Sequence, residues 1–372
     1  MKFIERFLQK KIDHIGLDIG NYAIKLVELK QGQDDDDHQV VTYGKTSLPA
    51  NSIVDGMIKN EAAVTNALIS IKEERKLRDK ATVNVSVNGR NVMTRTLKLP
   101  IMPIDELNQA VMFEAEKYIP TPIEQLYLDY TILGEAIVDN IPQFNILLAA
   151  VPKEMVDTLC RVVEGANLKL YGVEIEPLGL YRMWHAYYHD ETLVNQAILN
   201  MGHTSCNLVV FQNNNIQFTR IIPIAGLQMT EAIIQVAQKE VAVAIELKHK
   251  QHLRQDATPA DTAEMIDNVI NLDSSSTYDS QMDNGDQQVL KALDDTLISL
   301  TQEIQRSIDF YQMQAKVRLD RLIITGGSAE LQGLDNYLEA ELGIPVLVGV
   351  YGELDPTYSL ASGLALKDFM PI

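Results

Sequence analysis

The first strongly patterned stretch of the chain is IGLDIGNYAIKLVEL, from Ile15 to Leu29. Two apolar runs stand on either side of a short polar break that contains Asp18, Gly20 and Asn21. Apolar runs separated by a break of this length predict two strands joined as a hairpin. A plain hairpin does not need an aspartate at the end of a buried strand, so Asp18 is a candidate for chemistry.

Along the rest of the chain the pattern alternates strands with helices. Runs of β-branched and apolar residues predict strands at Thr82–Val87 and Phe144–Val151, and apolar positions at helical spacing predict a helix from Asp105 to Ile119. A helix, a strand and a second helix follow, at about 153–166, 168–175 and 178–188. This order is typical of α/β proteins.

The opening hairpin has a second copy near the middle of the chain. Leu17-Asp18-Ile19-Gly20 matches Leu199-Asn200-Met201-Gly202 without a gap, and Leu26-Val27 matches Leu208-Val209 at the same spacing. Two copies of one strand-turn-strand unit, each opening one half of the chain, suggest two similar domains that face each other. A match this short is also compatible with a coincidence between two ordinary hairpins.

A third turn follows an apolar strand late in the chain. Gly326-Gly327-Ser328 comes directly after the run Leu322–Thr325 and before a helix. Glycines in such a turn let backbone N–H groups approach a ligand closely, which suits phosphates and nucleosides. Taken alone, the turn fits an ordinary strand-helix connection equally well.

Composition narrows the classes of function. The 372 residues include 32 Lys+Arg and 51 Asp+Glu, which gives a net charge of −19. Nucleic-acid binding needs clustered cations, so we expect no nucleic-acid partner. Only Cys160 and Cys206 occur, without a CxxC pair, which argues against a disulfide framework or a cysteine zinc site and fits a reducing cytoplasm.

No apolar run reaches the length of about 20 residues that a membrane-spanning helix needs. The N-terminal MKFIERFLQKK places Phe3, Ile4, Phe7 and Leu8 on one helical face, with basic residues around them. This segment fits a helix packed on its own domain, a loosely ordered tail, or a contact with lipid.

The order of two hairpins and a Gly-Gly turn resembles the actin-like ATPase superfamily. Within it, GLDIGNYAIKLVEL and especially FEAEKYIPTPIEQLYLDY, from Phe113 to Tyr130, resemble the PilM family of type IV pilus assembly, a relative of the cell-division protein FtsA. The likeness runs from about Ile15 to Lys367, with one gap. It implies an α/β protein with the actin-like ATPase fold, in which two domains surround a nucleotide cleft and one carries an inserted small subdomain.

The resemblance divides the chain as follows: a first domain at 1–181 with an inserted subdomain at about 82–151, a second domain at 192–351, and a C-terminal helix at 356–368 that packs back on the first domain. The segment from about 254 to 288 holds eight acidic residues, one basic residue and few apolar ones. Such a composition cannot bury enough surface to fold alone, so we expect a mobile acidic loop that is dispensable for nucleotide binding.

The resemblance also implies a site for ATP and Mg²⁺. Backbone amides, a cation and oxygen ligands for the metal are what such a site requires. Asp18 would face Mg²⁺ through water and is the implied metal residue, and Lys25 would add positive charge. The implied nucleotide-binding residues are Asp18, Gly20, Asn21, Tyr22, Lys25, Asn200, Gly202, His203, Thr204, Ser205, Gly226, Lys248, Gly326, Gly327 and Ser328.

One helix departs from the family pattern. AIELKHKQ resembles an Ala-Glu-x-x-Lys helix that reaches the ribose, but its glutamate is Glu246 and does not directly follow Ala244. The resemblance implies that Lys248 and, less directly, Glu246 reach the ribose of the nucleotide. Surface charges that pair with each other along the helix are the alternative reading.

Asn200 stands where ATPases of the superfamily commonly carry an aspartate. An amide keeps the shape and loses the charge, so the resemblance implies ATP binding with slow or no hydrolysis. The alternative is that Asn200 is simply a turn residue in a family whose members hydrolyse ATP slowly.

Three functions are compatible with this pattern. The first is a cytoplasmic ATP-binding adaptor of pilus assembly, peripheral to the inner membrane, that binds the cytoplasmic tail of a PilN-like membrane protein and meets other pilus assembly proteins. The second is an FtsA-like filament-forming protein, which would be expected to carry a C-terminal amphipathic membrane helix that LALKDFMPI does not provide. The third is an actin-fold small-molecule kinase, for which no aspartate motif stands out between Thr82 and Val151.

The adaptor reading alone accounts for EAEKYIP. It places the partner tail at edge strands near Thr82–Leu99, with TRTLKLP (Thr94–Pro100) as the rim, where a peptide could extend a sheet edge. Self-association is compatible with all three readings.

Overall fold

The computed structural model describes residues 13–32, 38–138, 141–190, 192–251, 253 and 284–370. The N-terminal segment and most of the acidic segment lie outside these residues, so the predictions made for them stay predictions. Within the described part of the chain, no helix is both long and apolar enough to cross a membrane.

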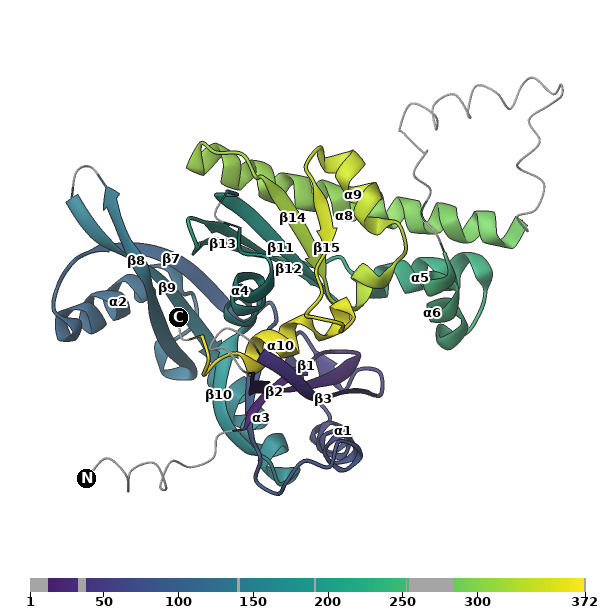
Figure 1. Cartoon of the computed structure of the whole chain (residues 1–372), viewed down its shortest axis with the longest axis horizontal. Helices are drawn as coiled ribbons and strands as arrows, with labels where there is room; N and C mark the ends of the chain where they lie inside the picture. Colours follow the sequence, from purple (N-terminus) through teal and green to yellow (C-terminus); the bar gives the residue numbers. More distant parts are fainter. Residues whose placement is uncertain are drawn as a thin grey trace.

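The first sheet holds the opening hairpin. Its strands lie in the order β10–β6–β1–β2–β3 (Figure 1). Their bounds are β1 (His14–Ile19), β2 (Ala23–Gln31), β3 (His38–Ser47), β6 (Thr82–Val87) and β10 (Lys169–Ile175). β1 and β2 pair antiparallel, as predicted, with Asp18 directly opposite Lys25, and β6 runs parallel to β1. The predicted hairpin is therefore the centre of a larger sheet.

The second sheet repeats the topology of the first. Its strands lie in the order β13–β12–β11–β14–β15. Their bounds are β11 (Asn195–Met201), β12 (Cys206–Gln212), β13 (Asn215–Ile222), β14 (Arg321–Thr325) and β15 (Val346–Val348). β11 and β12 form a hairpin in which Asn200 lies opposite Asn207, and β14 runs parallel to β11 as β6 does to β1. The short sequence repeat thus marks a repeat of the whole sheet.

A third sheet, of three strands, projects at one end of the molecule (Figure 1). Its order is β7–β9–β8, with β7 (Met93–Pro100), β8 (Leu126–Val138) and β9 (Ile141–Pro152). The helix α2 (Ile104–Tyr118) covers it through a buried stripe of Leu107, Val111 and Ala115.

Two predicted boundaries need correction. Thr82–Val87, which the sequence placed in the inserted subdomain and near a sheet edge, is a central strand of the first sheet between β10 and β1. Strand periodicity does not tell which sheet a strand joins; the segment with a sheet of its own begins at Met93. The sequence predicts that the acidic segment reaches Gln288, but α8 (Asn284–Ala315) already begins at Asn284, and its apolar residues Val289 and Leu293 are buried.

Helices pack on the sheets and connect them. Besides α2 and α8, the described helices are α1 (Glu61–Glu74), α3 (Lys153–Gly165), α4 (Glu176–Tyr187), α5 (Gly226–Ala237), α6 (Val241–Lys250), α9 (Leu334–Leu342) and α10 (Ser359–Ala365). Short 3₁₀ helices lie at Ile123–Gln125, Gly327–Glu330 and Pro356–Tyr358, and a two-residue hairpin pairs β4 (Ile53–Val54) with β5 (Met57–Ile58).

The helix α10 packs against β1 and α4, two elements that are far from it in the sequence (Figure 1). The contact is backbone to backbone. A Cβ atom on Gly16 would lie 1.9 Å from the carbonyl oxygen of Ala361, and a Cβ atom on Gly363 would lie 1.9 Å from that of Gly179. Only glycine permits this approach, and through it α10 completes the core of the first sheet.

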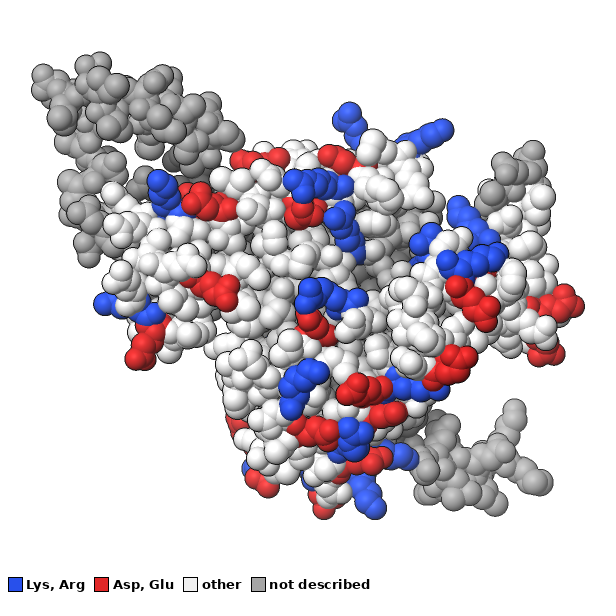
Figure 2. Space-filling model, turned by 180° about the vertical axis from the view of Figure 1, so that it is seen from behind, with Lys and Arg blue, Asp and Glu red and all other residues white. Residues whose placement is uncertain are grey.

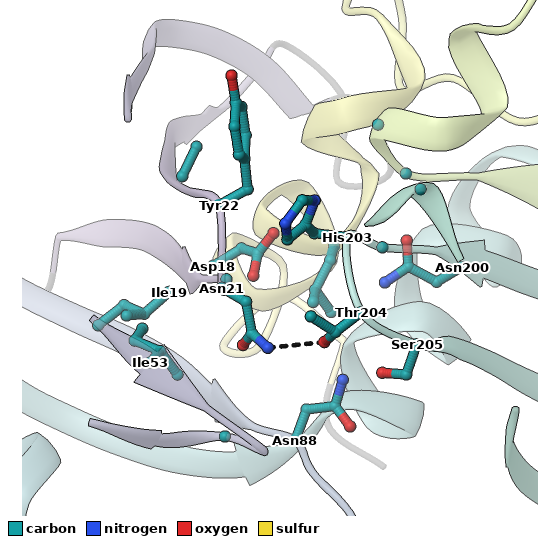
Figure 3. Close-up of a pocket in the computed structure, with 18 of the residues that line it drawn as sticks. Asp18, Ile19, Asn21, Tyr22, Ile53, Asn88, Asn200, His203, Thr204 and Ser205 are labelled. Atoms are coloured by element: carbon teal, nitrogen blue, oxygen red, sulfur yellow. Dashed lines mark hydrogen bonds between the residues drawn. The ribbon is translucent and has the colours of Figure 1, made fainter. Parts of the chain in front are cut away.

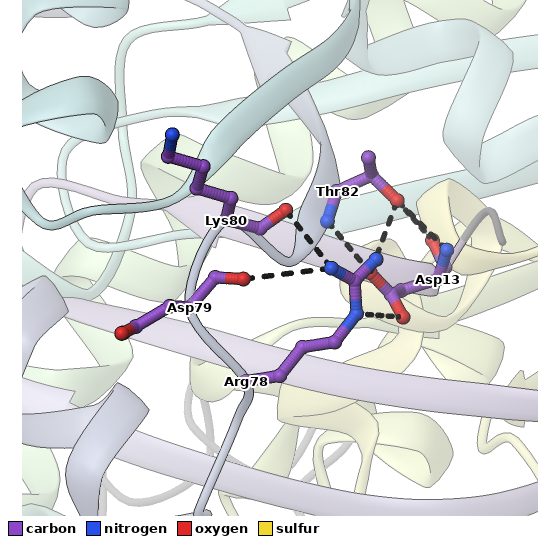
Figure 4. A network of polar contacts seen from close by, with 5 residues as sticks. All are labelled: Asp13, Arg78, Asp79, Lys80 and Thr82. Atoms are coloured by element: carbon purple, nitrogen blue, oxygen red, sulfur yellow. Dashed lines mark hydrogen bonds and ion pairs between the residues drawn. The ribbon is translucent and has the colours of Figure 1, made fainter. Parts of the chain in front are cut away.

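A polar network fixes the start of β1 against the start of β6 (Figure 4). The backbone N–H of Thr82 donates to Oδ2 of Asp13 at 2.8 Å, and the N–H of Asp13 donates to Oγ1 of Thr82 at 2.7 Å. Nε of Arg78 donates to Oδ1 of Asp13 at 3.0 Å. These bonds set the register of β1, and hence the position of Asp18 near its other end.

The face opposite to that of Figure 1 carries charges of both signs. Figure 2 shows Lys and Arg side chains interspersed with Asp and Glu over the described residues of that face. Neither sign dominates on this face.

Candidate functional site

The two hairpins meet at a cavity of about 420 Å³ between the two large sheets (Figure 3). All fifteen residues that the sequence pointed to line this one cavity: Asp18, Gly20, Asn21, Tyr22, Lys25, Asn200, Gly202, His203, Thr204, Ser205, Gly226, Lys248, Gly326, Gly327 and Ser328. They come from both hairpins, from α5 and α6, and from the turn after β14. The structure therefore brings them together, while their roles in binding stay a prediction.

The two turns that line the cavity carry backbone N–H groups without a backbone partner. Each turn closes on itself through one bond, from Gly20 N to the carbonyl of Ala23 at 3.2 Å, and from Gly202 N to that of Ser205 at 3.1 Å. Among the described residues, the N–H groups at positions 21, 22, 203 and 204 donate no backbone hydrogen bond. These turn residues are half-buried or, at Tyr22, exposed, and N–H groups without a backbone partner in such a turn are suited to binding an anion.

Asp18 and Lys25 form an ion pair inside the first hairpin. Nζ of Lys25 lies 2.9 Å from Oδ2 of Asp18, and both side chains are largely shielded from solvent. The pair stands beside the turn at Gly20, where the Lys25 ammonium also approaches the backbone. A cation and a carboxylate are thus available at the same end of the cavity.

The matching positions of the second hairpin carry amides. Asn200 and Asn207 stand where the first hairpin has Asp18 and Lys25, and Nδ2 of Asn200 donates to Oε1 of Glu176. Asn207 also donates to this carboxyl group. One hairpin therefore holds a charged pair, and the other holds a buried carboxyl group.

Glu176 is a residue of the cavity that the sequence did not single out. It is 3% exposed at the first position of α4. Burial raises its pKa from 4.5 to about 7, with a smaller contribution from the nearby charge of Asp18. A carboxyl group that titrates near neutral pH inside a cavity is a common feature of functional sites. Its only sequence signal, an acid followed by proline at a helix start, is ordinary for a helix N-terminus.

Lys248 enters the cavity from α6. It is 7% exposed, and its Nζ donates to the carbonyl of Gly226 at 3.3 Å and to Oγ1 of Thr230 at 3.2 Å. Burial lowers its pKa from 10.5 to about 8. Glu246 instead points to solvent, where it pairs with Lys250 at 2.7 Å, as the surface alternative predicted.

The Gly-Gly turn closes the end of the cavity next to the second hairpin. Gly326 has a φ of +87°, and a Cβ atom there would lie 2.5 Å from Oδ1 of Asn200. Oγ of Ser328 donates to the carbonyl of Gly202 at 2.8 Å. The glycine is therefore required both by the backbone angle and by the close approach to the second hairpin.

The tips of the two hairpins touch across the cavity. Nδ2 of Asn21 donates to Oγ1 of Thr204 at 2.6 Å, and the rings of Tyr22 and His203 lie 5.2 Å apart between centroids. Burial, with the charges of Lys248 and Lys25, lowers the pKa of His203 from 6.5 to about 4, so its ring is neutral at pH 7. No local pattern in the sequence predicts these contacts, because 183 residues separate Asn21 from Thr204.

A second cavity, of about 490 Å³, opens beside the first between β7 and β13. The two cavities share Val87, Asn88, Arg90, Glu176 and Pro223 as a common wall. We call the second cavity the groove. Thr94 and Arg95, at the start of the predicted rim, line it together with Tyr118 and Ile119 of EAEKYIP.

The groove runs along two sheet edges. β7 and β13 are each the outer strand of their sheet, and Oγ1 of Thr94 lies 2.7 Å from Oγ1 of Thr219 where the strands approach. The Arg95 guanidinium lies 3.9 Å above the ring of Tyr118. An outer strand offers backbone groups to an extended peptide, and an aromatic ring with an adjacent cation offers a side-chain contact.

Comparison with known proteins gives the following matches. A family model described as type IV pilus assembly protein PilM matches residues 16–266, and one described as cell division protein FtsA matches residues 197–363. The chain is 22% identical over 381 aligned positions to cell division protein FtsA of Bacillus subtilis (strain 168), covering 94% of this chain and 82% of that protein. It is 23% identical to FtsA of Borreliella burgdorferi over 95% of this chain and 90% of that protein.

Solved structures give the fold. A PilM-PilN type IV pilus biogenesis complex superposes with a TM-score of 0.79 at 24% identity, covering 97% of this chain and 100% of that one. The ethanolamine utilization protein EutJ of Carboxydothermus hydrogenoformans gives 0.57 at 13% identity, covering 96% and 90%. MreB5 of Spiroplasma citri bound to ADP gives 0.52 at 12% identity, covering 96% of each chain. The predicted actin-like ATPase fold is therefore confirmed.

Proposed function

The chain belongs to the type IV pilus assembly protein PilM family, and from this premise we propose that it is an ATP-binding adaptor of the pilus assembly machinery. In this role it works at the cytoplasmic face of the inner membrane and binds the cytoplasmic tail of a PilN-like membrane protein. One observation carries the proposal: the nucleotide-type cavity and the groove share a wall, so one molecule offers both sites side by side.

The first cavity supports ATP binding by its chemistry. The cavity offers the groups that a polyphosphate requires, namely four N–H groups without a backbone partner on two opposed turns and the ammonium groups of Lys25 and Lys248. Solved neighbours with this fold include MreB5 of Spiroplasma citri bound to ADP and to AMPPNP. The Gly326–Ser328 turn would take the nucleoside, and the hairpin turns would take the phosphates.

Magnesium would bind mainly through the nucleotide. No group of three or more His, Cys, Asp or Glu side chains suited to a metal ion is present among the described residues. Mg²⁺ commonly keeps several waters and uses one or two carboxylates with substrate phosphates. Asp18 fits the role of the carboxylate that holds a metal-bound water.

The groove supports binding of a tail. A solved neighbour is a PilM-PilN complex, and the groove has the features that an extended peptide uses, namely the outer strands of two sheets and an aromatic contact with an adjacent cation. Apolar side chains of the tail would meet Val92, Ile119 and Leu148 along the groove. The partner would tether a chain whose described residues contain no spanning helix.

The nucleotide content of the purified protein tests the proposal. The nucleotide is released by acid and separated by anion exchange, and we expect retained ATP. In parallel, a fluorescent peptide of the PilN-like tail should bind the protein with nucleotide present. A protein that carries no nucleotide and binds none in calorimetry would contradict the adaptor reading.

A second candidate function is an FtsA-like filament-forming protein. The match of residues 197–363 to the FtsA model, and the two FtsA relatives, favour this alternative. Light scattering and sedimentation with ATP distinguish the two: an adaptor stays in a small assembly, whereas a filament former sediments when nucleotide is added.

A further inference from the structure

The tips of the two hairpins are joined by one hydrogen bond. Asn21 and Thr204 belong to different sheets, and their side chains meet at 2.6 Å (Figure 3). The rings of Tyr22 and His203 pack beside them, tilted by 39°. Because His203 is neutral at pH 7, this packing is free of charge repulsion from Lys25 and Lys248. The tips are thus held together while the cavity behind them stays open.

A phosphate bound by both turns at once would need the gap that this bond spans. The open N–H groups lie on both turns, at residues 21, 22, 203 and 204, so a phosphate that accepts from both turns must sit between them. The side chains of Asn21 and Thr204 bridge the same gap. With the nucleoside at the Gly326–Ser328 turn, as proposed above, a diphosphate is one phosphate shorter and would leave this gap unfilled.

We propose that the Asn21–Thr204 hydrogen bond discriminates between nucleoside diphosphates and triphosphates: it persists when a diphosphate binds and must break when a triphosphate enters between the turns. The inference rests on the proposed nucleotide-binding function and specifies its selectivity. Asn21 and Thr204 act as selectivity residues at the position of the last phosphate.

The size of the effect follows from the strength of one bond. A hydrogen bond of this kind contributes about 0.5–1.5 kcal/mol net, which corresponds to roughly a threefold to tenfold change in an equilibrium constant. Breaking it is a cost to the triphosphate alone. Removing the bond in advance should therefore raise triphosphate affinity by that factor and leave diphosphate affinity unchanged.

Calorimetric titration with ADP and with the non-hydrolysable AMP-PNP, both with excess Mg²⁺, tests this proposal. The variants are Asn21→Ala, Thr204→Val and the double variant, and Thr204→Ser is the matched control because it keeps the hydroxyl group. We expect the preference for AMP-PNP over ADP to rise about threefold to tenfold in each single variant. The double variant should show no further gain, because both changes remove the same bond. Because Thr204→Ser keeps the hydroxyl group, its preference for AMP-PNP should rise less than that of Thr204→Val.

The outcomes separate the two proposals. Equal changes in ADP and AMP-PNP affinity, additive effects in the double variant, or a selective loss of AMP-PNP affinity would each overturn the selectivity proposal and leave nucleotide binding standing. If the unmodified protein binds neither nucleotide, the proposed function itself fails and the selectivity fails with it. Both side chains are in half-buried turns, and circular dichroism of each variant checks its fold.

Discussion

Nζ of Lys25 lies 2.9 Å from Oδ2 of Asp18, directly across the first hairpin, so each of these charges is neutralised by the other. Phosphate binding would draw the ammonium toward the nucleotide and leave Asp18 facing a polyanion. A carboxylate in that position is tolerated only if a cation lies between it and the phosphates. The ion pair therefore connects ATP affinity to magnesium.

We expect Asp18→Ala to remove the magnesium dependence of ATP binding. A residue that holds a metal-bound water typically contributes about 10- to 100-fold to metal affinity, and the loss of ATP affinity in excess Mg²⁺ should be of that order. Titrations with and without EDTA measure it. Asp79→Ala is the control, because Asp79 pairs with Lys72 on the surface with its side chain 77% exposed. If Mg²⁺ still raises the ATP affinity of the Asp18→Ala variant, Asp18 does not have this role.

Glu176 should make the folded state less stable as pH rises. Its pKa is about 7 in the folded chain and 4.5 when solvated, so the folded state binds the proton more tightly. The stabilisation is present below pH 4.5, declines as pH rises, and is lost above pH 7. Glu176→Gln cannot ionise, and its free energy of unfolding relative to the unmodified protein should rise by about 2–3 kcal/mol between pH 5 and pH 8.

Urea unfolding at several pH values measures this difference. Comparing variant with unmodified protein cancels the opposite contribution of His203, whose lowered pKa makes the folded state less stable as pH falls from 6.5 to 4. A difference that stays constant from pH 5 to pH 8 would show that Glu176 does not titrate in this range.

Asn200→Asp should increase phosphate release. The unmodified chain has an amide where a charged group would help a phosphoryl transition state, and one such contact is typically worth about 10²–10³ in rate. We expect turnover by the isolated protein well below about one per second, and a measurable rise in the variant. Asn207→Asp is the matched control, because Asn207 also contacts Glu176 from the neighbouring strand. Rapid steady-state turnover by the unmodified chain would argue against the adaptor reading.

Arg95→Glu should weaken tail binding and spare the nucleotide. The Arg95 guanidinium lies over the ring of Tyr118 in the groove. The loss of a central aromatic or arginine contact often costs about 2 kcal/mol, which is roughly a thirtyfold loss of affinity. Lys98→Glu on the same strand makes the same charge change on an exposed side chain outside the groove. Fluorescence anisotropy of a labelled tail peptide measures the affinity of each of the two variants for the tail. Equal binding by both variants would place the tail elsewhere.

The sequence predicted the two hairpins well because their evidence is local. Alternating apolar residues and a glycine turn define each hairpin, and the gapless match between Asp18 and Asn200 ties them to each other. The resemblance to a family then supplied the remaining residues, and all of them line one cavity. The helix that carries Lys248 departs from the family pattern in sequence, yet Lys248 is buried in the cavity.

What the sequence did not reveal depends on long-range packing. Glu176 looks like an ordinary acid at a helix start, and its burial follows only from the approach of β11 and β12 to α4. The strand at Thr82–Val87 was recognised, but its place inside the first sheet depends on pairing with β10, far along the chain. A one-dimensional pattern identifies such elements without telling which neighbours they find.

The backbone contact of α10 with β1 and α4 has a consequence for how the chain is made. The ribosome adds residues at about 5–20 per second, so α10 at Ser359 emerges roughly ten to thirty seconds after α4 ends at Tyr187. Until then the backbone faces at Gly16 and Gly179 lack the helix that covers them. The first half of the protein therefore cannot finish folding as it is synthesised, and the nascent chain must wait for its last helix with part of that core exposed to chaperones.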